Sequence, residues 1–164
     1  PTISCTGHSL VKAKLRETGA PFAGEMSGHL FFNDGRWPGF DDGVYAGARI
    51  LEILSREADP SAALEALPSA VNTPELQIRM AEGENKAFIA RLQKEARFDD
   101  VLDVITIDGV RVEWNDGFAL ARSSNTTPVV VLRLEGDTPE ALERIKKTFA
   151  EVLLKVEPSL ELPF

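Results

Sequence analysis

The sequence predicts a mixed α+β / α/β protein in two parts: an incomplete mixed α/β domain, then a complete domain with an antiparallel sheet and two helices on one face. Residues 1–67 contain several helix patterns but a single extended apolar segment. One strand and a few helices cannot bury their apolar faces alone. Residues 68–74 contain two prolines among small and polar residues, typical of a hinge linker. Residues 75–164 hold a full set of strand and helix patterns.

Composition restricts the function. The 164 residues are 43% hydrophobic and 27% charged, as in globular proteins, and no apolar run approaches the ~18 residues of a membrane helix. A net charge of −8 argues against nucleic acid or an anionic membrane as partner, but not against a small phosphorylated molecule. The single cysteine, Cys5, and the absence of a secretory leader predict a cytoplasmic protein. Because the chain opens without methionine, we expect it to be a piece of a longer one.

The first part begins with a short predicted helix within residues 6–18, for which Ser9 can serve as the N-cap. An extended segment, Phe22–Phe32, follows and ends in a turn. Either Asp41 or Asp42 is expected to cap a helix over residues 44–54, whose apolar side chains recur at helical spacing. A second short helix is predicted over 60–67.

The second part alternates between strand and helix signals. Strands are predicted over 76–80, 101–107, 110–114, 118–121 and 129–134, and helices over 85–98 and from Pro139 to Val156. Asp108-Gly109 predicts a two-residue type I′ hairpin turn between the second and third of these strands. The nearly continuous apolar run 129–134 predicts the central strand, and Thr138 predicts the cap of the last helix.

A first polar cluster lies in residues 24–29, Gly-Glu-Met-Ser-Gly-His. If the segment is extended, its period of two places Glu25, Ser27 and His29 on one face, where they could bind a polyhydroxylated ligand. With His8, these side chains could instead bind a metal, although no H-E-x-x-H spacing is present. They could also act as a general acid/base set, or serve only as structural hydrogen-bonding groups.

A second polar cluster fills residues 122–128, Arg-Ser-Ser-Asn-Thr-Thr-Pro, between two predicted strands. The guanidinium of Arg122 can bind a phosphate through two hydrogen bonds, and hydroxyls, the Asn125 amide and backbone N–H groups can complete the shell. A polar loop of this kind can equally be an ordinary turn. No Walker pattern or G-x-G-x-x-G is present, so a nucleotide site is not indicated.

Together the two clusters resemble a known family. Residues 24–29, preceded by Thr6-Gly7-His8-Ser9 and followed by Phe40-Asp41-Asp42-Gly43, resemble the sugar-recognition region of the α-D-phosphohexomutases. Residues 122–128 are similar to the phosphate-binding loop of their C-terminal domain 4. The resemblance is closest to the bacterial phosphomannomutase/phosphoglucomutase subfamily and covers the whole chain.

The resemblance implies domain boundaries and an activity. Residues 1–67 would be the C-terminal part of domain 3, residues 68–74 a hinge, and residues 75–164 domain 4 with a TATA-binding-protein-like fold. The parent enzyme would interconvert hexose 1-phosphate and 6-phosphate of glucose or mannose through a phosphoserine and a bisphosphorylated sugar. Mg²⁺ would assist, with its ligands outside this chain, and a glucose 1,6-bisphosphate-type compound would be the activator and intermediate.

The resemblance also implies roles for individual residues. On the sugar side, Glu25 and Ser27 would bind the 3- and 4-hydroxyls, His29 would be a candidate general acid/base, and His8 a second, weaker candidate. On the phosphate side, the contacts would come from Arg122, Ser124, Asn125 and Thr126. No metal ligands are implied in this chain.

The chain departs from the family pattern in what it lacks. We find no serine loop of the T-[AS]-S-H-N-P type and no D-G-D-x-D-R metal loop, which belong to domains 1 and 2. Those domains and the first part of domain 3 would be its partners within the same enzyme, and this segment alone would be inactive. The alternative is a stand-alone module that binds a phosphorylated sugar or a protein.

Overall fold

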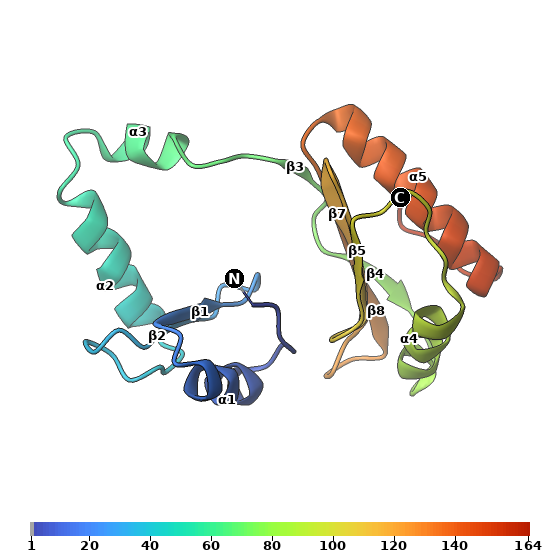
Figure 1. Ribbon diagram of the computed structural model, residues 1–164, viewed down its shortest axis with the longest axis horizontal. Helices are drawn as coiled ribbons and strands as arrows, with labels where there is room; N and C mark the ends of the chain where they lie inside the picture. Colours follow the sequence, from blue (N-terminus) through green and yellow to red (C-terminus); the bar gives the residue numbers. More distant parts are fainter. Residues whose placement is uncertain (1) are drawn as a thin grey trace. The chain divides into compact units, whose positions relative to one another are not determined.

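The computed structural model describes residues 2–164, which form two compact units, the first ending at Pro68 and the second spanning Ser69–Phe164. The first unit pairs a short hairpin with three helices (Figure 1). Its elements are α1 (His8–Thr18), β1 (Phe22–Gly24), β2 (Leu30–Phe32), α2 (Gly43–Leu54) and α3 (Pro60–Glu65). Its core is small because three residues fill it: Val11, Leu15 and Phe31.

The start of α1 differs from the prediction. Gly7, not Ser9, is the N-cap residue, and Ser9 lies inside the helix. The predicted cap was wrong because the helix begins earlier, where the Gly7 carbonyl accepts the N–H groups of Leu10 and Val11. The Gly7 N–H in turn donates to the carboxylate of Glu25, distant in sequence, at 2.5 Å. A contact between segments 18 residues apart thus ties the beginning of α1 to the hairpin.

Helix α2 begins where the sequence predicts. The Asp42 side chain accepts a hydrogen bond from the Tyr45 N–H at 2.9 Å, which confirms one of the two predicted caps. None of the residues of α2 is buried, although the helix is rich in apolar side chains. Val44 is 87% exposed and Leu51 67%, so the apolar side of α2 has no partner within the described residues.

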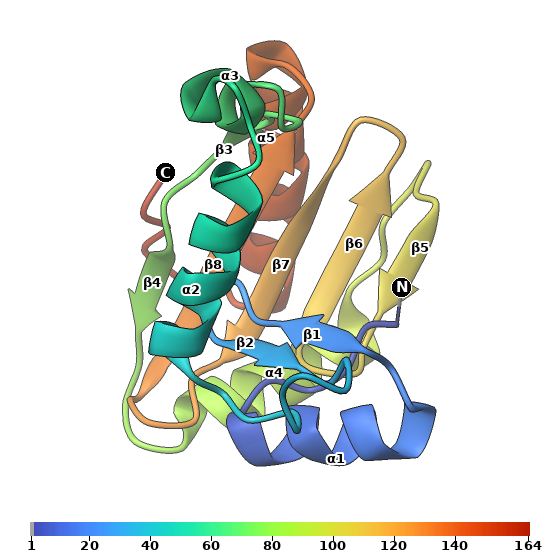
Figure 2. The same cartoon turned by 90° about the vertical axis from the view of Figure 1, so that its left-hand side faces the viewer.

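The second unit is a six-stranded antiparallel sheet with two helices. Its elements are β3 (Val71–Asn72), β4 (Leu76–Arg79), α4 (Glu84–Glu95), β5 (Asp103–Ile105), β6 (Val110–Trp114), β7 (Gly117–Ser123), β8 (Val129–Gly136) and α5 (Pro139–Val156). The strand order is β3-β8-β7-β6-β5, with β4 also paired to β8 (Figure 2). The middle position belongs to β7, so the prediction that 129–134 is the central strand was wrong. The run is apolar because β8 pairs on both sides and is buried along most of its length.

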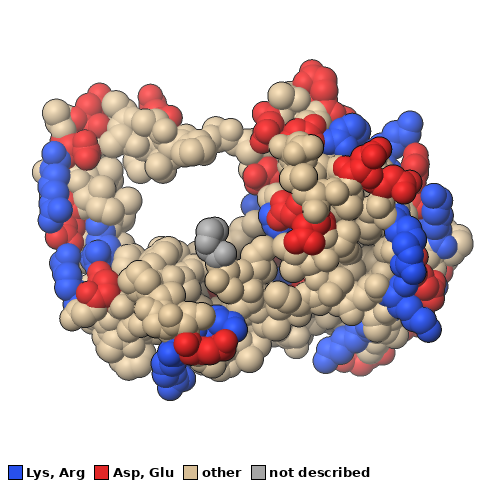
Figure 3. Space-filling view, viewed as in Figure 1, with Lys and Arg blue, Asp and Glu red and all other residues tan. Residues whose placement is uncertain are grey.

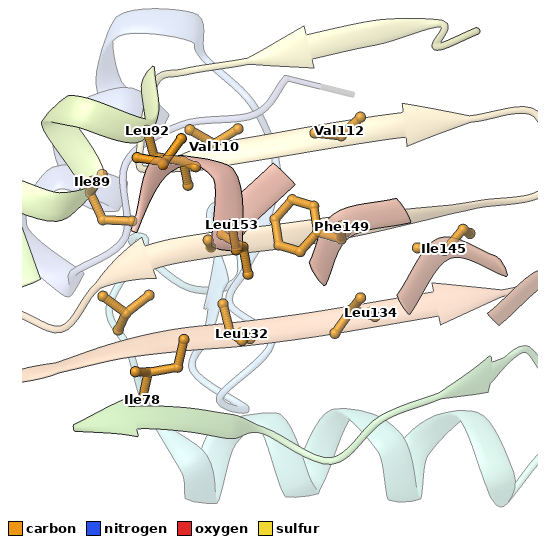
Figure 4. Packing of buried hydrophobic residues seen from close by; sticks show 14 of the residues in the cluster. Ile78, Ile89, Leu92, Val110, Val112, Leu132, Leu134, Ile145, Phe149 and Leu153 are labelled. Carbon is orange, nitrogen blue, oxygen red and sulfur yellow. The ribbon is translucent and has the colours of Figure 1, made fainter. Parts of the chain in front are cut away.

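Both helices of this unit pack on one face of the sheet, which confirms the predicted fold class. Alternate residues of the strands, such as Val112 and Leu132, face Leu92 of α4 and Phe149 of α5 (Figure 4). All four side chains are fully buried. Thr138 caps α5 as predicted, by accepting a hydrogen bond from the Ala141 N–H at 3.2 Å.

The turn at Asp108-Gly109 is longer than predicted. Strand β5 ends at Ile105, so four residues connect it to β6. A type I′ turn requires positive φ at both central residues, but here Gly109 has φ +91° and Asp108 does not have a positive φ. The side chain of Gln93 binds the carbonyls of Thr106 and Gly109, which stabilises the wider loop.

The segment predicted as a hinge is partly paired. Val71 and Asn72 form β3 against the end of β8, and Thr73 donates its N–H to the Leu134 carbonyl at 2.9 Å.

Within residues 2–164, no helix is both long and apolar enough to cross a membrane. On the face drawn in Figure 3, acidic and basic side chains lie interspersed rather than in one field of a single sign.

Ion pairs stabilise the first unit around α2. Arg49 pairs with Asp34 at 2.5 Å, and Arg36 pairs with Glu52 at 2.8 Å. The hydrogen bond from Arg49 lowers the pKa of Asp34, and the hydrogen bond from Arg36 lowers the pKa of Glu52. Because the folded-state pKa values lie below the unfolded ones, this stabilisation is complete only above about pH 5. It is lost as the pH falls through the folded-state values.

We therefore expect the first unit to become less stable as the pH drops below about 5. The chain has two tryptophans, so Trp114→Phe leaves Trp37 as the fluorescent reporter of the first unit. Urea titrations of this variant at several pH values measure the free energy of unfolding. Adding Arg49→Gln should flatten the dependence below about pH 5. An equal acid dependence with and without Arg49 would show that the Arg49–Asp34 pair does not cause it.

Candidate functional site

The first polar cluster lies on a hairpin turn, not on an extended strand. The Gly28 N–H donates to the Glu25 carbonyl at 3.0 Å and closes a tight turn, with Gly28 at φ +89°. The Glu25 N–H in turn donates to the His29 carbonyl at 2.9 Å. The predicted alternation of Glu25, Ser27 and His29 along one face was wrong, because a glycine with positive φ after a turn is typical of a three-residue hairpin loop. Glu25 and His29 flank the loop, and Ser27 lies within it, exposed.

The turn brings the two sugar-side motifs together. Oε1 of Glu25 accepts the Gly7 N–H, so the start of α1, where His8 lies, is fastened to the hairpin. A carboxylate has two oxygens with several lone pairs, and this bond occupies one position on one of them. Glu25 can therefore hold the local structure and accept a hydrogen bond from a ligand hydroxyl at the same time. His8 is exposed at the first position of α1.

His29 has a carboxylate partner that the sequence did not predict. Its Nδ1 lies 2.6 Å from Oδ2 of Asp41, and the two side chains are 53% and 29% exposed. In the sequence, Asp41 appears only as one of two candidate helix caps. In the structure the two aspartates have different roles, since Asp42 caps α2 and Asp41 binds the imidazole of His29. No spacing rule relates a hairpin histidine to an aspartate 12 residues later.

The second polar cluster lies at the β7–β8 connection. Arg122 is in the last part of β7 and half-buried, whereas residues 125–128 are exposed. Gly109 packs against this arginine so closely that a Cβ there would lie 2.7 Å from the Arg122 Cβ. A hollow of about 130 Å³ is lined by residues 124–128 and by the beginning of α4, including Gly83 and Lys86. Its lining combines hydroxyl, amide and backbone groups with one cation, Lys86, and one carboxylate, Glu82. Hydroxyl, amide and backbone N–H groups of this kind can bind an anion.

Ser124 organises this loop from within. Its Oγ accepts hydrogen bonds from the backbone N–H groups of Thr126 and Thr127 at 3.3 and 3.2 Å. It also lies 3.0 Å from the Thr127 hydroxyl. Two N–H groups and several hydroxyls are therefore gathered at one side of a short loop. The roles of Arg122, Ser124, Asn125 and Thr126 in binding phosphate stay predictions.

A buried amide supports the same loop and was missed from the sequence. Asn85, in the first turn of α4, is 4% exposed. Its Nδ2 lies 3.2 to 3.4 Å from the carbonyls of Ser124, Thr127 and Val129, on both sides of the loop. The signal in the sequence was faint, because a polar residue at a helix start is usually exposed. Its partners lie about 40 residues away and only the fold brings them near.

We expect Asn85→Ala to lower the free energy of unfolding by about 1–3 kcal/mol, because it removes the buried amide that donates to the carbonyls of Ser124, Thr127 and Val129. Asn125→Ala is the matched control, since it removes the same amide from an exposed position of the loop. The control should change stability by no more than about 0.5 kcal/mol. Chemical denaturation followed by Trp114 fluorescence measures both. Equal effects of the two substitutions would show that the buried contacts contribute nothing.

The described residues bring together no group of three His, Cys, Asp or Glu side chains that could hold a metal ion. The alternative in which His8, Glu25 and His29 bind a metal therefore has no support in residues 2–164.

Comparison with known proteins identifies both units. Residues 2–71 match the model for "Phosphoglucomutase/phosphomannomutase, alpha/beta/alpha domain III", and residues 75–152 match the model for the C-terminal domain of the same family. The chain belongs to the phosphoglucomutase/phosphomannomutase family. The resemblance seen in the sequence is confirmed, including the two domain types and their order.

Curated relatives of this family are much longer than the chain. It is 54% identical over 149 residues to a phosphoglucomutase of Neisseria gonorrhoeae, with 90% of the chain and 32% of the relative aligned. It is 51% identical over 165 residues to a phosphomannomutase/phosphoglucomutase of Pseudomonas aeruginosa, with 100% of the chain and 35% of the relative aligned. The chain thus spans about a third of the length of the curated relatives it matches.

A solved family member has the same structure over this region. A phosphoglucomutase/phosphomannomutase family protein from Burkholderia thailandensis is 61% identical, with a TM-score of 0.91 over 100% of this chain and 34% of the other. A putative phosphomannomutase from Thermus thermophilus, 20% identical with a TM-score of 0.52 over 88% of this chain and 30% of the other, shares the fold alone.

Proposed function

We propose that this chain is the substrate-binding portion of a phosphohexomutase that interconverts hexose 1-phosphate and hexose 6-phosphate of glucose or mannose. The observation that carries the proposal is the match of two consecutive domains of one family, in order, along a single chain. The names of the relatives, phosphoglucomutase and phosphomannomutase/phosphoglucomutase, support the two sugars. Residues 1–67 form the sugar-recognition part and residues 75–164 the phosphate-binding part.

In this proposal the hairpin cluster, comprising His8, Glu25, Ser27 and His29, binds the sugar. The carboxylate of Glu25 accepts hydrogen bonds from sugar hydroxyls, and the Ser27 hydroxyl can both donate and accept. Such groups can bind adjacent hydroxyls whichever end of the sugar carries phosphate. His29 accepts a proton from the hydroxyl that is to be phosphorylated, and His8 is a second contact near the reacting end.

The β7–β8 loop binds the phosphate that is not transferred. Arg122 supplies charge and two parallel donors, and Ser124, Asn125 and Thr126 supply neutral donors around it. The residues 68–74 act as a hinge on which domain 4 closes over the substrate. Because β3 and β4 both pair with β8, we expect the bending point to lie before Val71.

The remaining two thirds of a protein as long as the relatives supply what this chain lacks. We assign the phosphoserine, the Mg²⁺ ligands and the turnover of a glucose 1,6-bisphosphate-type intermediate to domains 1 and 2. The first part of domain 3 covers the exposed apolar side of α2, since an alpha/beta/alpha domain buries its helices against a sheet larger than one hairpin. The longer protein works in the cytoplasm in this proposal.

Variants of Glu25 in the full-length enzyme test the sugar-binding role. Glu25→Gln keeps an oxygen that can accept the Gly7 N–H but replaces the other acceptor with a donor. We expect kcat/KM for glucose 1-phosphate to fall about 13- to 160-fold, as for the loss of a charged hydrogen bond worth ~1.5–3 kcal/mol. Glu17→Gln on the exposed side of α1 is the control. Unchanged kcat/KM in Glu25→Gln would refute the sugar-binding role of this carboxylate.

A further inference from the structure

The buried amide of Asn85 has one fixed orientation. Its Oδ1 accepts the Lys86 N–H at 3.0 Å, so the donating Nδ2 faces the other way, toward the β7–β8 loop. There Nδ2 lies 3.2 Å from the carbonyl oxygen of Ser124. Within residues 2–164 this carbonyl has no other hydrogen-bond donor. The direction of the Ser124 carbonyl therefore depends on Asn85.

The direction of this carbonyl also fixes the N–H group that follows it. A trans peptide unit is planar, so its C=O and N–H bonds point in opposite directions. Because the Ser124 carbonyl points at the buried amide, the Asn125 N–H points away from it. Asn125 is exposed, so its N–H is directed to the accessible side of the loop.

The neighbouring N–H groups of the loop are already engaged. The Ser124 N–H donates to the Val129 carbonyl at 2.9 Å. The N–H groups of Thr126 and Thr127 donate to Oγ of Ser124 at 3.3 and 3.2 Å. Among the described residues the Asn125 N–H has no partner. It is therefore the backbone donor that this loop can offer to an anion without breaking a hydrogen bond.

We propose that Asn85 is a positioning residue that orients the peptide between Ser124 and Asn125 so that the Asn125 N–H donates to the bound phosphate. This inference rests on the proposed function. Asn85 acts through this peptide and does not itself bind the phosphate. Without the amide, the Ser124 carbonyl would lose its buried donor, and the peptide would be free to rotate. The rotated peptide would present a carbonyl oxygen to the anion in place of an N–H hydrogen.

Titration of the ¹⁵N-labelled 164-residue chain with inorganic phosphate tests this orientation. In the wild-type chain we expect the Asn125 amide proton to move downfield, as for an N–H that begins to donate to an anion. In Asn85→Ala this shift should be lost, and the Kd for phosphate should rise at least about tenfold. Amide signals of Val112 and Leu132 report whether the core is intact. If Asn85→Ala does not fold, Asn85→Ser gives the same comparison, because its hydroxyl is too short to reach the carbonyl.

A substitution in the same helix controls for lost stability. Ile89→Val removes one methyl group from a buried side chain of α4 that does not belong to the loop. It should leave the Kd for phosphate within twofold of wild type. The inference would be overturned by an equal loss of affinity in Ile89→Val and Asn85→Ala, or by a folded Asn85→Ala chain with the wild-type shift. A wild-type chain whose Asn125 amide does not respond to phosphate would also overturn it.

Kinetics of the full-length enzyme separate this inference from the proposed function. Asn85→Ala should raise KM for glucose 1-phosphate about tenfold and change kcat less than about threefold, because a phosphate that is not transferred is bound alike in the ground state and the transition state. Ile89→Val should change neither constant. An unchanged KM in Asn85→Ala would overturn the inference and leave the mutase activity standing. Failure of the proposed function would appear differently, as a wild-type enzyme without mutase activity.

Discussion

The 164-residue chain alone is expected to convert no glucose 1-phosphate into glucose 6-phosphate. Phosphoryl transfer needs a donor and, in this proposal, Mg²⁺. The sequence holds neither a T-[AS]-S-H-N-P serine loop nor a D-G-D-x-D-R metal loop, and residues 2–164 contain no cluster of metal-binding side chains. An assay coupled to oxidation of glucose 6-phosphate, with glucose 1,6-bisphosphate and Mg²⁺ supplied, measures the activity.

The full-length enzyme at equal concentration is the control for this assay. It should turn over, and the 164-residue chain should give the rate of the blank. Turnover by the chain that survives repurification would contradict the assignment of the chemistry to other domains. It would instead favour the alternative of a self-sufficient module.

Arg122→Ala in the full-length enzyme is expected to lower kcat/KM about 13- to 160-fold, corresponding to the ~1.5–3 kcal/mol of a charged hydrogen bond. Arg122 lies half-buried beside a loop of hydroxyls and N–H groups, so a phosphate there would lose its charged donor. Arg122→Lys should give an intermediate loss, because lysine keeps the charge but not the two parallel donors.

Arg97→Ala is the matched control for this experiment, since it removes an exposed guanidinium that binds backbone carbonyls at the C-terminal end of α4. We expect less than a twofold change. A loss in Arg97→Ala equal to that in Arg122→Ala would mean that net charge, rather than a local phosphate contact, sets the affinity.

Local signals in the sequence predicted those parts of the fold that depend on neighbouring residues. Asp42 and Thr138 cap the helices for which they were candidates, because a cap is decided by the two or three residues that follow. The core strands and both helices of the second unit follow from apolar periodicity. Ser9 failed as a cap because the helix begins earlier, with the Gly7 carbonyl as its first acceptor, and the distant carboxylate of Glu25 binds the Gly7 N–H.

The candidate site was predictable in its residue types but not in its geometry. The cluster at residues 24–29 was recognised from composition, whereas its turn depends on the positive φ of Gly28. The two supporting residues, Asp41 and Asn85, were not assigned roles from the sequence. Each contacts a segment 12 or about 40 positions away, and no local pattern records such a contact.

NMR titration of the uniformly ¹⁵N-labelled 164-residue chain with glucose 1-phosphate, mannose 1-phosphate and inorganic phosphate tests most directly whether both clusters bind one sugar phosphate. The account predicts that the sugar phosphates shift amide signals at Glu25–His29 and at Arg122–Thr126, while inorganic phosphate shifts the second set alone. Shifts confined to Arg122–Thr126 with every ligand would contradict it and would describe a simple phosphate-binding loop.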